Sequence, residues 1–230
     1  MAEWQVIQGN CLEVMRGMAD GSVDAVITDP PYLRKFLPLY GRMAAELPRL
    51  LKDGGSLLAI VPHYGLPEVL AAVGEYLKYR WILCMWQSTG SHPRLAMGIE
   101  VMWKPVVWWV KRAWPQGRGF VRDGFENLPV AKNGHPWEQS LSWADYCMHF
   151  VPDGGTVLDP FMGSGTTGVA CMQTGRNFIG IEISEEYCTI ARARISAAAA
   201  QLRMPFDPKS QSDDNSHTGV VTCQSSLPNL

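Results

Sequence analysis

The feature that most constrains this chain is a glycine-rich loop between an apolar run and a helix-period stretch. Residues 156–182 read TVLDPFMGSGTTGVACMQTGRNFIGIE, so one apolar run enters Gly163-Ser164-Gly165-Thr166-Thr167-Gly168 and a second ends at Glu182. Glycines at such a turn let the backbone approach a nucleoside cofactor closely, and a carboxylate ending the next strand can accept both ribose hydroxyls. The pattern predicts a βαβ unit with a nucleoside site at its turn.

The same alternation of apolar runs and helix-period stretches continues along the chain and predicts an α/β fold with a mainly parallel sheet. A length of 230 residues fits one domain, which we place at residues 1–203. Residues 112–134 are rich in Gly, Pro and Arg and are interpreted as an insertion, and the polar residues 204–230 as a disordered tail. Strands are expected at 4–8, 23–28, 56–61, 80–86, 105–110, 156–159 and 177–182, and helices at 11–18, 36–51, 66–79, 139–150, 166–174 and 184–202.

Composition excludes several classes of protein. The six cysteines are scattered without a CxxC pair, so no metal site or disulfide framework is expected. No stretch approaches the roughly 20 apolar residues that cross a bilayer, and no basic start precedes an apolar run, so we expect a cytoplasmic protein without a membrane partner. The formal net charge is −2, but the cations concentrate between Lys104 and His135, where a nucleic acid could bind.

The residues in front of the glycines distinguish two nucleoside cofactors. Asp159-Pro160-Phe161 places a carboxylate where the pyrophosphate of NAD would lie, which is repulsive. S-adenosylmethionine has no phosphate and carries a cationic amino group and a sulfonium, which a carboxylate favours. The loop therefore favours S-adenosylmethionine, and a nicotinamide-dependent oxidoreductase stays as a more distant alternative.

A second motif, Asp29-Pro30-Pro31-Tyr32, follows the apolar run 23–28. Two prolines fix the backbone and remove N–H donors, which leaves a carboxylate, a directed carbonyl and an aromatic face together. Two acceptors that bind the hydrogens of a base amino group would free the nitrogen lone pair for a methyl group and stabilise the charge that develops there. Tyr32 could stack on a base that has left the duplex.

With these two motifs the chain resembles the β class of amino-group DNA methyltransferases, which methylate N6 of adenine or N4 of cytosine. Asp29-Pro30-Pro31-Tyr32 is similar to their catalytic motif, and Asp159-Pro160-Phe161-Met162-Gly163-Ser164-Gly165 to their cofactor motif. His135-Pro136 with the helix after it resembles the motif that leads into the cofactor motif, and Gly9-Asn10 resembles another family motif. The catalytic motif comes first, which is a circularly permuted order.

The resemblance implies a Rossmann-like, seven-stranded mixed sheet, the class I fold of methyltransferases that use S-adenosylmethionine. It places strand 4–8 at one edge beside 177–182, and strands 156–159 and 23–28 as central neighbours. It implies catalysis by the tetrapeptide Asp29, Pro30, Pro31 and Tyr32, with no metal. The cofactor contacts that we predict on this basis are Asn10, His135, Asp159, Phe161, Gly163, Gly165, Thr166, Thr167 and Glu182.

The predicted reaction is site-specific methylation of adenine N6 in double-stranded DNA, because an aspartate rather than a serine leads the tetrapeptide; cytosine N4 is the alternative. A DNA-binding protein with a decayed site is a third hypothesis, and the intact Asp29 and Tyr32 speak against it. The insertion is short, which predicts a short recognition sequence or help from a second subunit in a homodimer. DNA contacts are predicted at Arg112, Trp114, Arg118, Arg122, Lys132 and Trp137.

Overall fold

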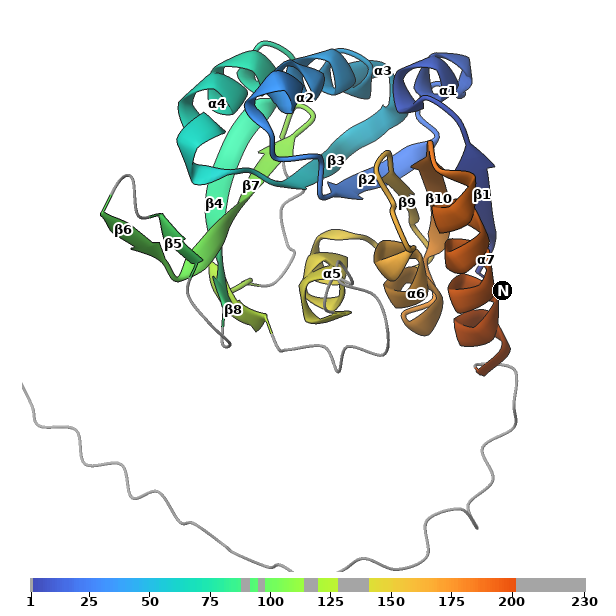
Figure 1. The fold of residues 1–230 in the computed structure, drawn as a ribbon. Coiled ribbons are helices and arrows are strands. Elements are labelled where there is room, and N and C mark those ends of the chain that lie inside the picture. Colours follow the sequence, from blue (N-terminus) through green and yellow to red (C-terminus); the bar gives the residue numbers. More distant parts are fainter. Residues whose placement is uncertain (1, 88–91, 95–97, 114–119, 128–140, 202–230) are drawn as a thin grey trace, which may run out of the picture.

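The computed structural model describes residues 2–87, 92–94, 98–113, 120–127 and 141–201 (Figure 1). Within these residues the chain forms one large mixed sheet of eight strands in the order β1-β10-β9-β2-β3-β7-β4-β8, and a separate pair, β5-β6. The strands are β1 Trp4–Gln8, β2 Val23–Thr28, β3 Leu51–Ile60, β4 Lys78–Gln87, β5 His92–Arg94, β6 Ile99–Val101, β7 Trp103–Val110, β8 Gly124–Asn127, β9 Thr156–Asp159 and β10 Asn177–Glu182.

Helices cover both faces of the sheet (Figure 1). One face carries α1 Cys11–Gly17, α2 Leu37–Ala44, α3 Leu47–Leu50 and α4 Leu66–Gly74. The other carries α5 Leu141–Cys147, α6 Thr166–Gln173 and α7 Glu185–Gln201. Short 3-10 turns lie at η1 Arg34–Phe36, η2 His63–Gly65 and η4 Met148–Phe150.

Two separate hydrophobic cores explain why the central strands are apolar almost throughout. In β2, Ala25 and Ile27 pack with α5, α6 and α7, while Val26 packs with α1, α2 and α4 on the opposite face. All three are fully buried. Because successive side chains of a strand point to opposite faces, most positions of a strand that is covered on both sides are apolar.

The predicted topology is confirmed. β1 forms the edge beside β10, and β9 pairs with β2 in parallel through Ala25↔Val157 and Val26↔Leu158. An eighth strand, β8, lies inside the predicted insertion, where it pairs with the second half of β4. Its four residues carry too little periodicity to be recognised as a strand from sequence alone.

Two predicted helices have different limits in the structure. The helix expected at 36–51 is divided into η1, α2 and α3, and β3 begins at Leu51. Pro38 and Pro48 each stand in the first turn of a new helix, because proline lacks the N–H that a helix interior needs. The helix expected at 66–79 ends at Gly74, and β4 begins at Lys78.

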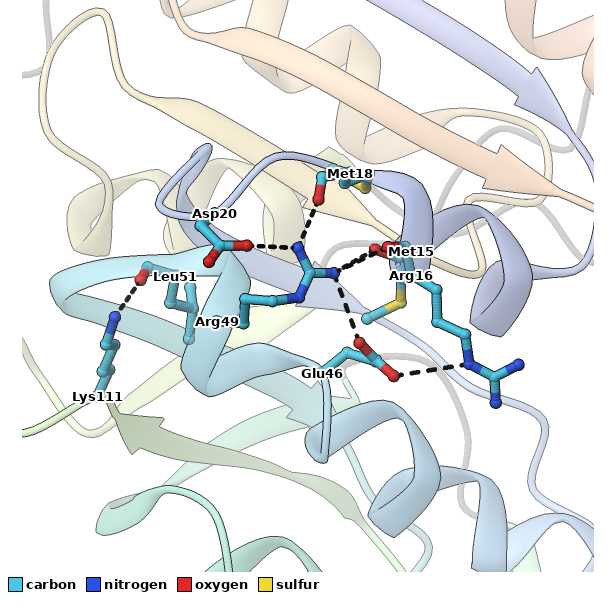
Figure 2. Close-up of polar contacts among 8 residues, drawn as sticks. All are labelled: Met15, Arg16, Met18, Asp20, Glu46, Arg49, Leu51 and Lys111. Carbon is cyan, nitrogen blue, oxygen red and sulfur yellow. Dashed lines mark hydrogen bonds and ion pairs between the residues drawn. The ribbon is translucent and has the colours of Figure 1, made fainter.

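Arg49 connects α3 to the C-terminal end of α1 (Figure 2). Its guanidinium donates hydrogen bonds to the carbonyl oxygens of Met15 at 2.8 Å, of Met18 and of Arg16, and forms ion pairs with Asp20 and Glu46. The last carbonyls of a helix have no partner within the helix. Arg49 therefore caps α1, whose N-terminal end contributes to the site described below.

Across the described ranges, no helix has the length and apolar character that a bilayer crossing requires. The same ranges contain no group of three or more His, Cys, Asp or Glu side chains arranged to hold a metal ion.

Candidate active site

The two sequence motifs begin at the ends of neighbouring strands. β2 ends at Thr28, just before the tetrapeptide, and β9 ends at Asp159, just before the glycine loop. The Thr28 hydroxyl donates a hydrogen bond of 2.8 Å to Asp159 Oδ1. In parallel strands the carboxyl ends meet at one edge of the sheet, so the register of β2 against β9 brings both turns to the same place.

Asp159 lies beneath the surface at the sheet edge where β2 and β9 end. Its side chain is almost completely buried and accepts hydrogen bonds from Thr28 Oγ1, from Thr167 Oγ1 at 2.7 Å and from the backbone N–H of Phe161 at 3.1 Å. Burial raises the pKa of Asp159 to about 7, although the three hydrogen bonds favour its charged form. Asp159 thus connects β2, the glycine loop and α6.

The glycines of the loop have two different roles. Gly163 has φ +50°, and a Cβ placed there would meet nothing within 4 Å, so the loop presents bare backbone to open space. Gly165 has φ +84°, but a Cβ there would lie 2.9 Å from the Cβ of Ala191 in α7. Gly165 is therefore required for packing against α7. Thr166 and Thr167, which begin α6, are also buried.

A cavity of about 770 Å³, here called the glycine-loop cavity, joins the two motifs. Asp29 and Pro31 of the tetrapeptide line it together with Phe161 and Gly163 of the loop. The other residues around it come from α1 and the two residues before it, from η1 and α2, from the glycine loop, and from the end of β10 to the first turn of α7: Gly9, Asn10, Cys11, Leu12, Phe36, Leu39, Arg42, Pro160, Ser164, Glu182, Ile183 and Tyr187. Its volume is within the range of ligand sites, about 300–1,000 Å³.

Backbone groups orient the two polar side chains that were predicted to bind a nucleoside. Glu182 Oε2 accepts a hydrogen bond of 3.1 Å from the N–H of Gly163, and Oε1 accepts one of 2.9 Å from the N–H of Ser184. Asn10 Oδ1 accepts from the N–H of Leu12 at 3.0 Å and so caps α1. Each carboxylate oxygen keeps acceptor capacity for a ribose hydroxyl.

Tyr32 lines a second cavity, of about 830 Å³, here called the tyrosine cavity. Its hydroxyl donates a hydrogen bond to Asp29 Oδ1, which holds ring and carboxylate in a defined relation. Burial and the charge of Asp29 raise the pKa of Tyr32 well above its ordinary value, so the hydroxyl remains a donor. The tetrapeptide thus stands between two cavities, with Asp29 and Pro31 on one and Tyr32 on the other. Pro30, which lies between Asp29 and Pro31 in the sequence, is buried.

Several residues around these cavities were not predicted from the sequence. Ile183 is 72 % exposed and lines the glycine-loop cavity directly after Glu182. Trp86 and Trp103 line the tyrosine cavity, where Trp103 meets the ring of His63 edge to face at 4.9 Å. Of these residues, only Ile183 could have been recognised from the sequence, because an apolar residue directly after the end of a strand has no core to enter.

The structure does not bring the described members of the predicted DNA-contact set to these cavities. Arg112 follows the far end of β7, away from Trp103, and pairs with Asp53 at 2.7 Å. Arg122 lines a third cavity of about 540 Å³ with residues of the first half of β4. The other predicted DNA contacts, Trp114, Arg118, Lys132 and Trp137, lie outside the described residues, as does His135, which was predicted to contact the cofactor.

Comparison with known proteins gives consistent likenesses. A family model described as DNA methylase matches residues 132–193. The chain is 28% identical over 231 residues to the putative methylase YubD of Escherichia coli strain K12, covering 86% of this chain and 92% of that protein. A match of 132 residues to the type II methyltransferase M2.DpnII of Streptococcus pneumoniae is 56% identical and covers 49% of each. A solved complex of M1.HpyAVI with SAM is similar in structure, with a TM-score of 0.67, 27% identity, and coverage of 84% and 98%.

Proposed function

Because this chain belongs to the amino-group DNA methyltransferases, which act on N6 of adenine or N4 of cytosine, we propose that it transfers a methyl group from S-adenosylmethionine to N6 of adenine in double-stranded DNA. The observation that carries the proposal is the position of the tetrapeptide between two cavities. One cavity holds the cofactor, and the other holds the target base after it leaves the duplex.

The glycine-loop cavity fits S-adenosylmethionine on three observations. Gly163 offers bare backbone where a side chain would intrude, and Glu182 is held by two N–H groups in a position to accept ribose hydroxyls. The exposed Ile183 provides an apolar face for the adenine ring, and Asn10 a polar group for its edge. Thr166, Thr167 and Asp159 support the loop from below. When bound, the cofactor supplies an activated methyl group on a sulfonium.

The tetrapeptide performs the remaining chemistry. Asp29 and the carbonyl of Pro30 accept hydrogen bonds from the base amino group, which moves electron density toward the nitrogen that is methylated. After the transfer this nitrogen loses one proton, which the Asp29 carboxylate can accept. The Tyr32 hydroxyl fixes the Asp29 carboxylate through its hydrogen bond, and the Tyr32 ring stacks on the base. Holding the amino group in line with the methyl donor lowers the entropic part of the barrier.

The test is modification-sensitive sequencing of DNA from cells that express the chain. We expect one methylated base at one position of a short motif, and none with Asp29→Ala. Methylated adenine N6 is expected because an aspartate leads the tetrapeptide, whereas methylated cytosine N4 would establish the other reaction of the family. Unmodified DNA, or an active Asp29→Ala variant, would overturn the proposal.

Binding of the cofactor is tested separately by calorimetric titration. We expect S-adenosylmethionine to bind the wild-type chain and NADH to release no heat. Tight binding of NADH at the same site would favour the nicotinamide-dependent oxidoreductase instead.

A further inference from the structure

We propose that Arg34 and Lys104 bind the two phosphates that flank the target nucleotide once its base occupies the tyrosine cavity. This inference rests on the proposed function and adds a part of the DNA site that neither sequence motif contains. It places the closest contacts to the DNA backbone at residues beside the tetrapeptide, rather than in the insertion 112–134.

Both cations lie at the tyrosine cavity, although they come from different parts of the fold. Arg34 begins η1, two residues after Tyr32, and Lys104 is the second residue of β7. Both line the cavity together with Tyr32. β7 is antiparallel to β3, and β3 is parallel to β2, so the first residues of β7 lie at the sheet edge where β2 ends. The sheet topology therefore brings Lys104 to the tetrapeptide.

Aromatic rings hold both cationic groups at this cavity. The guanidinium carbon of Arg34 lies 5.3 Å from the centre of the Tyr64 ring, and Lys104 Nζ lies 5.3 Å from the centre of the Tyr32 ring. These distances are within the range of cation–π contacts, about 6 Å. Such a contact orients a cation and leaves its N–H donors available for an anion.

The charges of this cavity are matched to a nucleotide rather than to a base alone. In the part of the chain that the structure describes, the side chains of Arg34 and Lys104 form no ion pair or hydrogen bond, whereas those of Arg49, Lys52 and Arg112 each pair with an aspartate. Among the described residues that line the tyrosine cavity, Glu100 is the one acidic residue. A neutral base needs no such excess of cations.

The phosphates beside an extruded nucleotide are negatively charged, whereas its base is neutral, so the phosphates are the groups that need cations. They arrive beside Asp29, whose negative charge repels them, and two cations at the same place offset that repulsion. The ammonium of a lysine sits on a flexible stem, so Lys104 can turn from the Tyr32 ring to the phosphate of a base that stacks there. Arg34 can bind the neighbouring phosphate through two parallel hydrogen bonds.

The experiment is a chemical double-mutant cycle on DNA affinity. The probe is a short duplex that carries the motif defined by sequencing, with the two phosphates around the target nucleotide either natural or replaced by neutral methylphosphonates. Wild-type chain, Arg34→Gln, Lys104→Gln and the double variant are titrated at several salt concentrations. Lys78→Gln is the matched control, because Lys78 is exposed at the opposite end of β4.

We expect each single substitution to weaken binding of the natural duplex and to reduce the slope of log Kd against log salt by about 0.9, the value for one phosphate contact. Methylphosphonates should weaken binding of the wild type but not of the double variant, since the partners are already lost. Lys78→Gln should remain sensitive to the methylphosphonates. Calorimetric affinity for S-adenosylmethionine should be unchanged in all variants.

Additive losses would overturn the assignment, because Arg34 and Lys104 would then act elsewhere than at these phosphates. Slower methyl transfer with an unchanged salt slope would also overturn it and make Lys104 a residue that positions Tyr32. In either case the wild-type chain still methylates DNA. A wild-type chain that methylates no DNA instead removes the proposed function, and this inference with it.

Discussion

Replacing Gly165 with alanine tests whether the glycine loop is held by contact with α7 as well as by its backbone conformation. Gly165 has φ +84°, a left-handed conformation that costs an alanine about 1–2 kcal/mol. The added Cβ would also lie 2.9 Å from the Cβ and 3.1 Å from the Cα of Ala191. These atoms belong to a helix backbone that cannot rotate away, and overpacking of this kind costs about a further 1–3 kcal/mol.

Gly175 provides the control, because it separates the two costs. It has φ +70°, close to the value at Gly165, but an added Cβ would meet nothing within 4 Å. Gly175→Ala should therefore carry only the conformational cost. We expect Gly165→Ala to lower the free energy of unfolding by about 1–3 kcal/mol more than Gly175→Ala does.

Urea unfolding of the two variants and the wild type measures this difference through the midpoint, provided that the slope m stays constant. A second readout is the affinity for S-adenosylmethionine, which should fall in Gly165→Ala alone, because the displaced loop carries Gly163 and its bond to Glu182. Equal destabilisation by both substitutions would refute the reasoning. The glycine would then be needed for its φ angle only.

Two further predictions concern buried polar groups. The pKa of Asp159 is raised from 3.8 to about 7, so its contribution to stability is complete below pH 3.8 and is lost as the pH rises through about 7. The free energy of unfolding from urea titrations should fall across this range by roughly 4 kcal/mol more in the wild type than in Asp159→Asn, and parallel pH profiles would contradict the burial of this carboxylate. Arg49→Met should lower the melting temperature more than Arg112→Met, because Arg49 bonds to the carbonyls that end α1 whereas Arg112 joins an exposed ion pair with Asp53. Equal melting temperatures for the two variants would show that Arg49 does not cap α1.

Local sequence was sufficient to predict β1, β2, β9 and β10, whose limits agree with those expected from their apolar runs. The signal is strongest in β2 and β9, because strands inside the sheet are covered on both faces and most of their side chains are buried. The glycine loop and the tetrapeptide were recognised for the same reason, because each follows such a strand directly. The four-residue edge strand β8 carries no comparable pattern.

The sequence by itself determined the chemical groups of this protein: the carboxylate, prolines and tyrosine of the tetrapeptide, the glycine loop, and Glu182 at the next strand end. Only the tertiary structure decided which of them reach a cavity. Asp159 is withdrawn below the surface by three hydrogen bonds, and Gly165 faces α7. Arg34 and Lys104 are 70 positions apart along the chain and share one cavity. The physical reason is that strand pairing, which joins distant segments, sets these distances, and local residue patterns do not encode it.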